Sequence, residues 1–267
     1  MASTPAQRGA GPATTADVGA RITVALFATC ANDVMFPQAP MATTRLLERL
    51  GCRVVFPTKQ TCCGQPLVNT GYYDQSVPIV RNFAETFGGY DYIVAPSGSC
   101  VGAIRHQHAM LADYAKDPGL RRDVDAVTSR TFDISEFLVD VLEVTDVGAY
   151  FPHVVTFHPT CHSLRVTHVG DKPNRLLAAV GGITVRELTD ADRCCGFGGT
   201  FALKNPDISV AMASDKARHV ADTGAEYLVA GDNLCLLNIS GVLNRQKAGI
   251  KPIHLVEVLA STAADHE

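Results

Sequence analysis

The chain has 267 residues, enough for one large or two small domains with packed cores. Its 23 Lys and Arg residues are balanced by 27 Asp and Glu, and the resulting formal net charge of −4 disfavours a nucleic-acid partner. No apolar stretch reaches the roughly 18 residues that a membrane-spanning helix needs, so we expect no transmembrane segment.

Residues 1–20 are predicted to form a disordered tail. They are rich in Ala, Thr, Gly and Pro and have no apolar periodicity, so they cannot bury enough surface to offset the entropy of ordering. A transit peptide is the competing interpretation, but Arg8 is the only basic residue before Arg21, and Asp17 interrupts the segment. Because the tail lacks an apolar signal core, we expect a cytoplasmic protein.

The first half of the chain alternates between predicted strands and helices. The β-branched and aromatic residues of 22–27 predict a strand that leads directly to Cys30. A helix follows with three leucines on one face of 46–50, and Gly51 marks its end. The order continues with a strand at 54–56, the Cys-Cys-Gly turn at 62–64, a further helix, a strand at 92–95 and Cys100.

The second half is predicted to repeat this order. Asn205 as a cap and Pro206 at the first helical position predict the start of its longest helix. A charged insertion at 116–125 has no counterpart here. The strands are predicted at 154–157, 184–185 and 227–230, ahead of Cys161, a second Cys-Cys-Gly turn at 194–196 and Cys235 respectively.

Eight of the nine cysteines match in pairs when the two halves are aligned. At this composition about 0.02 Cys-Cys-Gly triplets are expected by chance, so two of them indicate an internal duplication. Cys52 aligns with Gly182 and is predicted to pack in the core rather than to bind a ligand. The matched pairs are Cys30 with Cys161, Cys62 with Cys194, Cys63 with Cys195, and Cys100 with Cys235.

We therefore expect an α/β fold made of two similar Rossmann-like domains, each with a parallel sheet. The predicted domains span 21–145 and 150–262. Open α/β sheets bind ligands at the carboxyl ends of their strands, which is where the matched cysteines fall. Helix N-termini that follow these cysteines favour the thiolate over the thiol. Four cysteines per half should therefore converge at one edge of each sheet.

Four converging thiolates suit either a tetrahedral zinc ion or an iron–sulfur cluster. Structural zinc usually draws its ligands from Cys-x-x-Cys pairs, and neither half contains one. Adjacent cysteines would point in opposite directions on a regular strand, but Gly64 and Gly196 permit a left-handed turn that aims both sulfurs inward. Glycine also lets backbone amides approach an anionic cluster. The pattern favours iron–sulfur over zinc.

Other residues near the cysteines have a functional and a structural interpretation. His158 and His162 flank Cys161 and are candidates for hydrogen bonds to a cluster, with His162 also a candidate replacement for a missing thiolate. Helix capping or packing is the alternative for both. Arg165, one helical turn after Cys161, either offsets cluster charge or is a surface arginine.

The sequence resembles the CCG cysteine-rich domain family, and within it the LutA/YkgE-type lactate-utilization iron–sulfur proteins. Related members are the cysteine-rich subunit of heterodisulfide reductase and the iron–sulfur subunit of glycolate oxidase. The resemblance covers about residues 21–262. It is carried by Thr29-Cys30 with Phe36-Pro37, Cys62-Cys63-Gly64-Gln65-Pro66, Ser97-Gly98-Ser99-Cys100, His158-Pro159-Thr160-Cys161-His162, Cys194-Cys195-Gly196-Phe197-Gly198-Gly199, Lys204-Asn205-Pro206 and Gly231-Asp232-Asn233-Leu234-Cys235.

This resemblance implies electron transfer in a complex that oxidises L-lactate, or a related 2-hydroxy acid, to the 2-oxo acid. It implies one 4Fe–4S cluster per half, bound by the eight matched cysteines. No flavin or NAD is expected in this chain, which lacks a complete dinucleotide fingerprint. The implied partners are a ferredoxin-domain iron–sulfur subunit (LutB-like) and a LutC-like subunit, with peripheral membrane association through them.

Two functions from other classes remain as alternatives. A thiol–disulfide oxidoreductase of the heterodisulfide-reductase type would use the adjacent cysteines as redox pairs. However, the heterodisulfide reductase relative has a final Cys-x-x-Cys, whereas Ser97 and Asp232 occupy the first of these positions here, which disfavours a five-thiolate cluster. Asp232 is instead a candidate neighbour of the second cluster. A zinc-stabilised assembly scaffold would be colourless and have no reducible centre.

Overall fold

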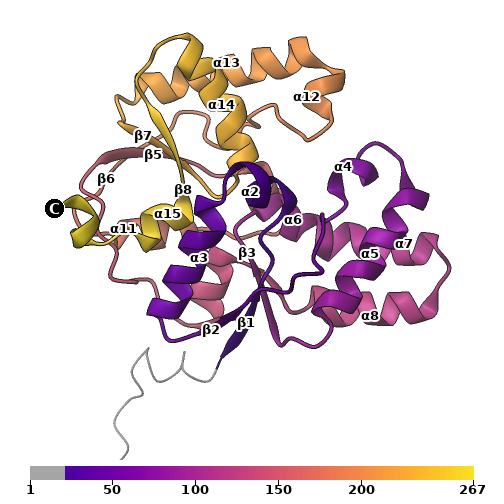
Figure 1. Ribbon diagram of the computed structural model, residues 1–267. Coiled ribbons are helices and arrows are strands. Elements are labelled where there is room, and N and C mark those ends of the chain that lie inside the picture. Colours follow the sequence, from indigo (N-terminus) through magenta and orange to yellow (C-terminus); the bar gives the residue numbers. More distant parts are fainter. Residues whose placement is uncertain (1–21) are drawn as a thin grey trace, which may run out of the picture.

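The computed structural model describes residues 22–267, and the tail predicted at 1–20 lies outside the described residues. The described chain folds into two α/β halves, each built on a four-stranded parallel sheet (Figure 1). The predicted fold class and internal duplication are therefore confirmed. The helices within 22–267 include none that is long and apolar enough to cross a membrane.

The first half has helices on both faces of its sheet. Its strands are β1 Thr23–Leu26, β2 Arg53–Val55, β3 Tyr92–Ala95 and β4 Thr131–Asp133. Its α-helices are α2 Cys30–Met35, α3 Gln38–Arg49, α4 Gln65–Val68, α5 Tyr73–Phe87, α6 Gly98–Gly102, α7 His108–Tyr114, α8 Pro118–Thr128 and α9 Ile134–Glu136, with π-helical turns η1 Ala103–Gln107 and η2 Phe137–Val141. The strands are ordered β2-β1-β3-β4, and each pairs in parallel with its neighbour.

Side chains of β1 alternate between the two faces of this sheet, as the strand period requires. Val24 shares one apolar core with α3, whereas Ala25 and Phe27 share another with α5. Gly51 follows α3 with φ 87°, so the predicted helix stop is confirmed. The charged insertion forms α8, and the second half has no corresponding helix between α14 and β8.

The second half repeats this architecture with the strand order β6-β5-β7-β8, again all parallel. Its strands are β5 Val154–His158, β6 Thr184–Arg186, β7 Tyr227–Ala230 and β8 Lys251–His254. Its helices are α10 Cys161–Arg165, α11 Lys172–Ala178, α12 Phe201–Lys204, α13 Pro206–Asp222, α14 Asn233–Arg245 and α15 Leu255–Ala260, followed by the short 3-10 helix η3 Ala263–His266. The helix predicted to begin at Pro206 does begin there, although the Asn205 side chain makes no capping hydrogen bond.

Corresponding helices of the two halves bury residues at the same spacing, which extends the alignment beyond the cysteines. The buried residues are Ser76, Val80, Phe83, Ala84 and Phe87 on α5, and Ser209, Ala213, Lys216, Ala217 and Val220 on α13. The third position of this series is Phe83 in the first half and Lys216 in the second. The position that holds an apolar ring in the first half thus holds a buried ammonium in the second.

The two halves pack together with an approximate internal two-fold relation. Helix α3 of the first half packs against α15 of the second (Figure 1), and their counterparts α11 and α9 also pack together. The cysteine-bearing helices follow the same rule, because α6 contacts α10 and α2 contacts α14. At this seam, the Asn233 side chain donates a hydrogen bond to Asn32 over 3.0 Å. The seam therefore joins the carboxyl edges of both sheets.

All four strands of each sheet lie within the ranges predicted for the two domains. The exact domain boundaries at 21–145 and 150–262 stay a prediction.

Candidate metal centres

The first half brings its four matched cysteines to the carboxyl edge of its sheet. Cys30 opens α2 after β1, Cys62 and Cys63 follow β2, and Cys100 lies in α6 after β3. The Sγ atoms of Cys30 and Cys62 are 3.4 Å apart. Cys63 interacts with both Cys62 and Cys100, so the four sulfurs form a continuous series.

The second half arranges its four cysteines in the same way. Cys161 opens α10 after β5, Cys194 and Cys195 follow β6, and Cys235 lies in α14 after β7. The Sγ atoms of Cys195 and Cys235 are 3.0 Å apart. Cys194 interacts with Cys161 and Cys195. The structure therefore places the eight predicted cysteines in two sets of four, while their role as ligands stays a proposal.

The glycine of each Cys-Cys-Gly turn adopts the left-handed conformation that was predicted for it. Gly64 has φ 83° and Gly196 has φ 85°. The N–H of each glycine donates to the Sγ of the first cysteine of its pair over 3.4 Å. A Cβ on Gly196 would lie 2.7 Å from the Ser209 carbonyl oxygen, so the second turn also needs glycine for steric reasons.

One sulfur in each set accepts hydrogen bonds that favour its thiolate form. Hydrogen bonds from Cys30 and then Cys63, together with the Gly64 amide, lower the pKa of Cys62. The pKa of Cys194 is lowered in the same way, with Cys161 as the largest cause. Cys30, Cys63, Cys161 and Cys195 donate hydrogen bonds to neighbouring sulfurs, and these bonds together with burial raise their pKa values, so that a further negative charge carries an energetic penalty. A cationic centre would remove this penalty, so the donor sets fit a metal or an iron–sulfur cluster.

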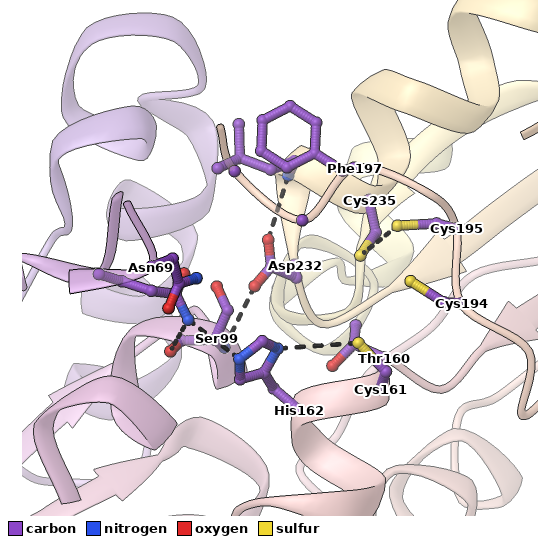
Figure 2. A pocket seen from close by; sticks show the side chains of 14 residues that line it. Asn69, Ser99, Thr160, Cys161, His162, Cys194, Cys195, Phe197, Asp232 and Cys235 are labelled. Carbon is purple, nitrogen blue, oxygen red and sulfur yellow. Dashed lines mark hydrogen bonds between the residues drawn. The ribbon is translucent and has the colours of Figure 1, made fainter. Parts of the chain in front are cut away.

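The two sites open to different surroundings. Cys30 is exposed, and with Cys62 it lines a surface pocket bordered by Val34 and Phe56. In the second half Cys195 and Cys235 are buried. The pocket beside them lies at the seam between the halves and is also lined by first-half residues, namely Gln65, Asn69 and Ser99 (Figure 2).

His162 bridges the second site to the first half. Its Nδ1 lies 3.7 Å from the Cys161 sulfur (Figure 2), and its Nε2 lies 3.0 Å from the Gln65 amide nitrogen. Gln65 stands two residues after Cys63 and also donates to the Ser99 carbonyl. The short path from Cys161 to Cys63 could not be found from the sequence, because the contact depends on how the halves pack.

Asp232 caps α14 and joins it to the first half. Its carboxylate accepts hydrogen bonds from the Leu234 amide, the Ser99 amide and the Ser97 hydroxyl, each over 3.2 Å. The residue is 3% exposed. The two positions that depart from the Cys-x-x-Cys pattern therefore contact each other across the seam.

His158 lies deeper in the second site than His162 does. It is the last residue of β5, it is 0% exposed, and neither ring nitrogen has a hydrogen-bond partner. The ring lies near the Ala191 carbonyl without making a hydrogen bond of normal geometry. One ring nitrogen and the sulfurs of Cys195 and Cys235 all lie within 4.8 Å of one another. Burial lowers the pKa of His158 to about 4, so the ring is neutral at neutral pH.

Two basic residues hold the loop that precedes the second Cys-Cys-Gly turn. Arg165 donates to the Asp192 carbonyl over 3.0 Å, so its guanidinium supports the loop and lies at the rim of a pocket that includes Cys194. Lys216, which is 2% exposed, donates to the carbonyls of Asp190 and Ala191. Lys216 was not predicted from the sequence. The signal for it is a lysine at the position of α13 that corresponds to the apolar Phe83 of α5.

Cys52 lies apart from both sets. It is buried in the apolar core that α3 shares with the sheet. Burial alone raises its pKa to about 11, with no contribution from another cysteine. This environment agrees with the predicted packing role.

Comparison with known proteins finds the same duplication. The family model of the CCG cysteine-rich domain matches the chain twice, over residues 24–105 and 155–240. Each match contains one of the two sets of four cysteines.

Curated relatives match most of the chain. Lactate utilization protein A of Exiguobacterium sp. is 47% identical over 238 residues, which cover 88% of this chain and 96% of the relative. The protein of the same name from Oceanobacillus iheyensis is 44% identical over 236 residues, with 88% and 96% covered. That of Bacillus thuringiensis is 42% identical over 238 residues, with 89% and 98% covered.

Proposed function

The chain belongs to the CCG cysteine-rich domain family, in which its curated relatives are lactate utilization proteins A, and we propose that it is an iron–sulfur electron-transfer subunit. In this proposal it serves a multi-subunit complex that oxidises L-lactate, or a related 2-hydroxy acid, to the 2-oxo acid. The observation that carries the proposal is the repeated set of four cysteines at the carboxyl edge of each sheet. One set alone would be compatible with a single structural metal.

Oxidation of a 2-hydroxy acid to a 2-oxo acid releases two electrons and two protons. An iron–sulfur cluster supplies a centre that takes up and releases one electron at a time. In each half, the four cysteines would hold the cluster and the amide of the following glycine would donate to a ligand sulfur. At the seam, Gln65, two residues after Cys63, contacts His162 beside Cys161, and this contact would connect the surroundings of the two centres.

Companion subunits complete the proposed reaction. Removing a hydride equivalent from the substrate ordinarily needs a flavin or nicotinamide, which we place on another chain. We propose a ferredoxin-domain iron–sulfur subunit (LutB-like) and a LutC-like subunit as partners, in the cytoplasm. Electrons would enter or leave this chain through them.

The test compares the chain alone with the assembled complex under anaerobic conditions. Alone, the chain should be brown and bleach on reduction with dithionite, yet show no lactate-dependent reduction of a dye. Addition of the two companions should start lactate-dependent dye reduction. Cys63→Ser should abolish this activity, whereas the matched variant Cys52→Ser should retain it.

Three outcomes would overturn the proposal. Lactate oxidation by the isolated chain would make it the catalytic subunit. A colourless protein that contains zinc would favour the assembly scaffold. Activity that survives loss of Cys30 and Cys100 but requires the adjacent pair Cys62 and Cys63 would favour thiol–disulfide exchange.

A further inference from the structure

The last residue of β5 differs in kind from its counterpart in the first half. Phe27 stands three residues before Cys30, and His158 stands three residues before Cys161. Phe27 packs edge-on against Phe83, with ring centroids 5.3 Å apart, inside an apolar core. An aromatic ring there fills space and needs no polar partner.

His158 is equally buried but carries two polar atoms that nothing satisfies. Leaving a buried polar atom without a hydrogen bond costs about 1–3 kcal/mol. The nearby ammonium of Lys216 does not serve His158, because it donates to the carbonyls of Asp190 and Ala191. The imidazole therefore lacks a protein partner where the first half has an ordinary apolar contact.

The groups within reach of the imidazole are sulfurs of the second site. One ring nitrogen lies within 4.8 Å of the sulfurs of both Cys195 and Cys235, which are themselves 3.0 Å apart. With metal–nitrogen and metal–sulfur bonds of about 2.0 and 2.3 Å, a nitrogen and a sulfur that bind the same metal ion would be separated by less than this limit. Among the residues that the structure describes, the cysteines of the first half form no comparable trio.

We propose that His158 is a fifth donor of the second site and would bind, through a ring nitrogen, an iron that also has a cysteine ligand, so that the two halves hold different centres. This inference rests on the proposed function, which places iron–sulfur clusters in both halves. The first half then has an all-cysteine centre, and the second has a mixed centre with four sulfur donors and one nitrogen donor. Imidazole is an established alternative to thiolate in iron–sulfur proteins.

The test uses pulsed EPR on the full chain, purified anaerobically and reduced with dithionite. Cys62→Ser removes the first centre and isolates the second, and Cys194→Ser does the reverse. Each protein is prepared with ¹⁴N-histidine and with ¹⁵N-histidine. The Cys62→Ser protein should show a strong nitrogen hyperfine coupling that changes with the isotope. The Cys194→Ser protein should show none.

Variants of the two histidines then identify the nitrogen. In the Cys62→Ser background, His158→Phe introduces the residue of the first half and should abolish the coupling. His162→Phe removes the competing histidine and should retain it. Should His158→Phe fail to assemble the centre, His158→Cys offers a thiolate instead, and an EPR-active centre without the coupling supports the proposal.

The possible failures are distinguishable. An EPR-active second centre without a strong histidine coupling overturns the role of His158 and leaves the proposed function intact, because a ring that only hydrogen-bonds a sulfur couples weakly. Loss of the coupling in His162→Phe, or its persistence in His158→Cys, also overturns the assignment to His158. Absence of any EPR-active centre from the unsubstituted chain overturns the proposed function itself.

Discussion

Behind the cysteines of the first half, Phe27 and Phe83 meet edge to face; at the corresponding positions of the second half stand His158 and Lys216. Strand order, turn geometry and cysteine placement are the same in both halves. The two halves therefore differ in the pair of residues that packs behind the cysteines, which we call the wall of the site. Buried polar groups that replace an apolar contact destabilise a core unless they form hydrogen bonds or bind a ligand. The first wall therefore contributes apolar packing, whereas the second places two buried polar groups behind the cysteines.

The residues at the edges of the two sites also differ, with an apolar residue in the first half and a charged one in the second. Four residues after the leading cysteine stands Val34 in the first half and Arg165 in the second. Val34 is 80% exposed beside Cys30, whereas Arg165 holds the loop before Cys194. A duplicated fold can thus keep two equivalent ligand sets while giving each its own environment.

The largest expected effect separates the two halves by their ligands. Cys62→Ser and Cys194→Ser occupy equivalent positions, and each should remove the centre of its own half only. Iron should fall from about eight to about four atoms per chain in either variant, as expected for two 4Fe–4S clusters. Iron analysis of anaerobically purified protein measures this.

Cys52→Ala is the matched control for these variants. It should leave the iron content unchanged, because Cys52 lies in the apolar core and away from both sites. Loss of a centre in Cys52→Ala, or loss of both centres in a single Cys→Ser variant, would contradict the independence of the two halves.

The second prediction compares the two walls directly. Phe83→Ala should lower the free energy of unfolding by about 3–5 kcal/mol, because it opens a cavity in an apolar core. Lys216→Met should cost less, about 1–3 kcal/mol, since methionine fills the space and only the hydrogen bonds to two carbonyls are lost. Anaerobic urea denaturation measures both free energies of unfolding. A larger loss for Lys216→Met would contradict the claim that the wall of the first half contributes more to stability than the wall of the second.

The third prediction uses the residues that cap the final helix of each half. Asp133 caps α9, and burial raises its pKa to about 7. The native state therefore binds this proton more tightly than the unfolded chain does. The stabilisation that results is present at low pH and is lost as the pH rises from about 4 through 7. His254 caps α15, and burial lowers its pKa to about 4. Its contribution is present above about 6.5 and is lost as the pH falls toward 4.

The two caps should change the free energy of unfolding in opposite directions as the pH rises. Between pH 5 and 7.5, each contributes about 2 kcal/mol to the pH dependence of the free energy of unfolding. Asn is also a good cap and does not titrate, so Asp133→Asn should become relatively more stable at pH 7.5 and His254→Asn relatively more stable at pH 5. Denaturation at both pH values measures this, and a shift in the same direction for both variants would contradict it.

Much of the fold could be predicted from the sequence because its rules are local. Short β-branched runs, a glycine after a leucine-lined helix and a proline at a helix start each fix an element without reference to the other half. Parallel sheets then bring strand ends to one edge, so the convergence of each set of four cysteines followed from their order alone. The left-handed turns at Gly64 and Gly196 followed from the adjacency of two cysteines that both point inward.

The seam and the depth of each histidine could not be predicted in this way. Which surface of one half packs against the other depends on the whole surface of both, so the contact between Gln65 and His162 has no local signal. Adjacency to Cys161 drew attention to His162 as a thiolate replacement. The structure places His158 nearer to the buried sulfurs, since the end of a central strand lies inside the core whereas the first turn of a helix lies at its rim.

The central claim is that both halves hold iron–sulfur centres, and the most direct test is the joint measurement of iron and acid-labile sulfide in the unsubstituted chain, purified without exposure to air. Two 4Fe–4S clusters predict about eight iron and about eight sulfide per chain. About four of each would leave one half without a centre, and zinc without sulfide would contradict the account in both.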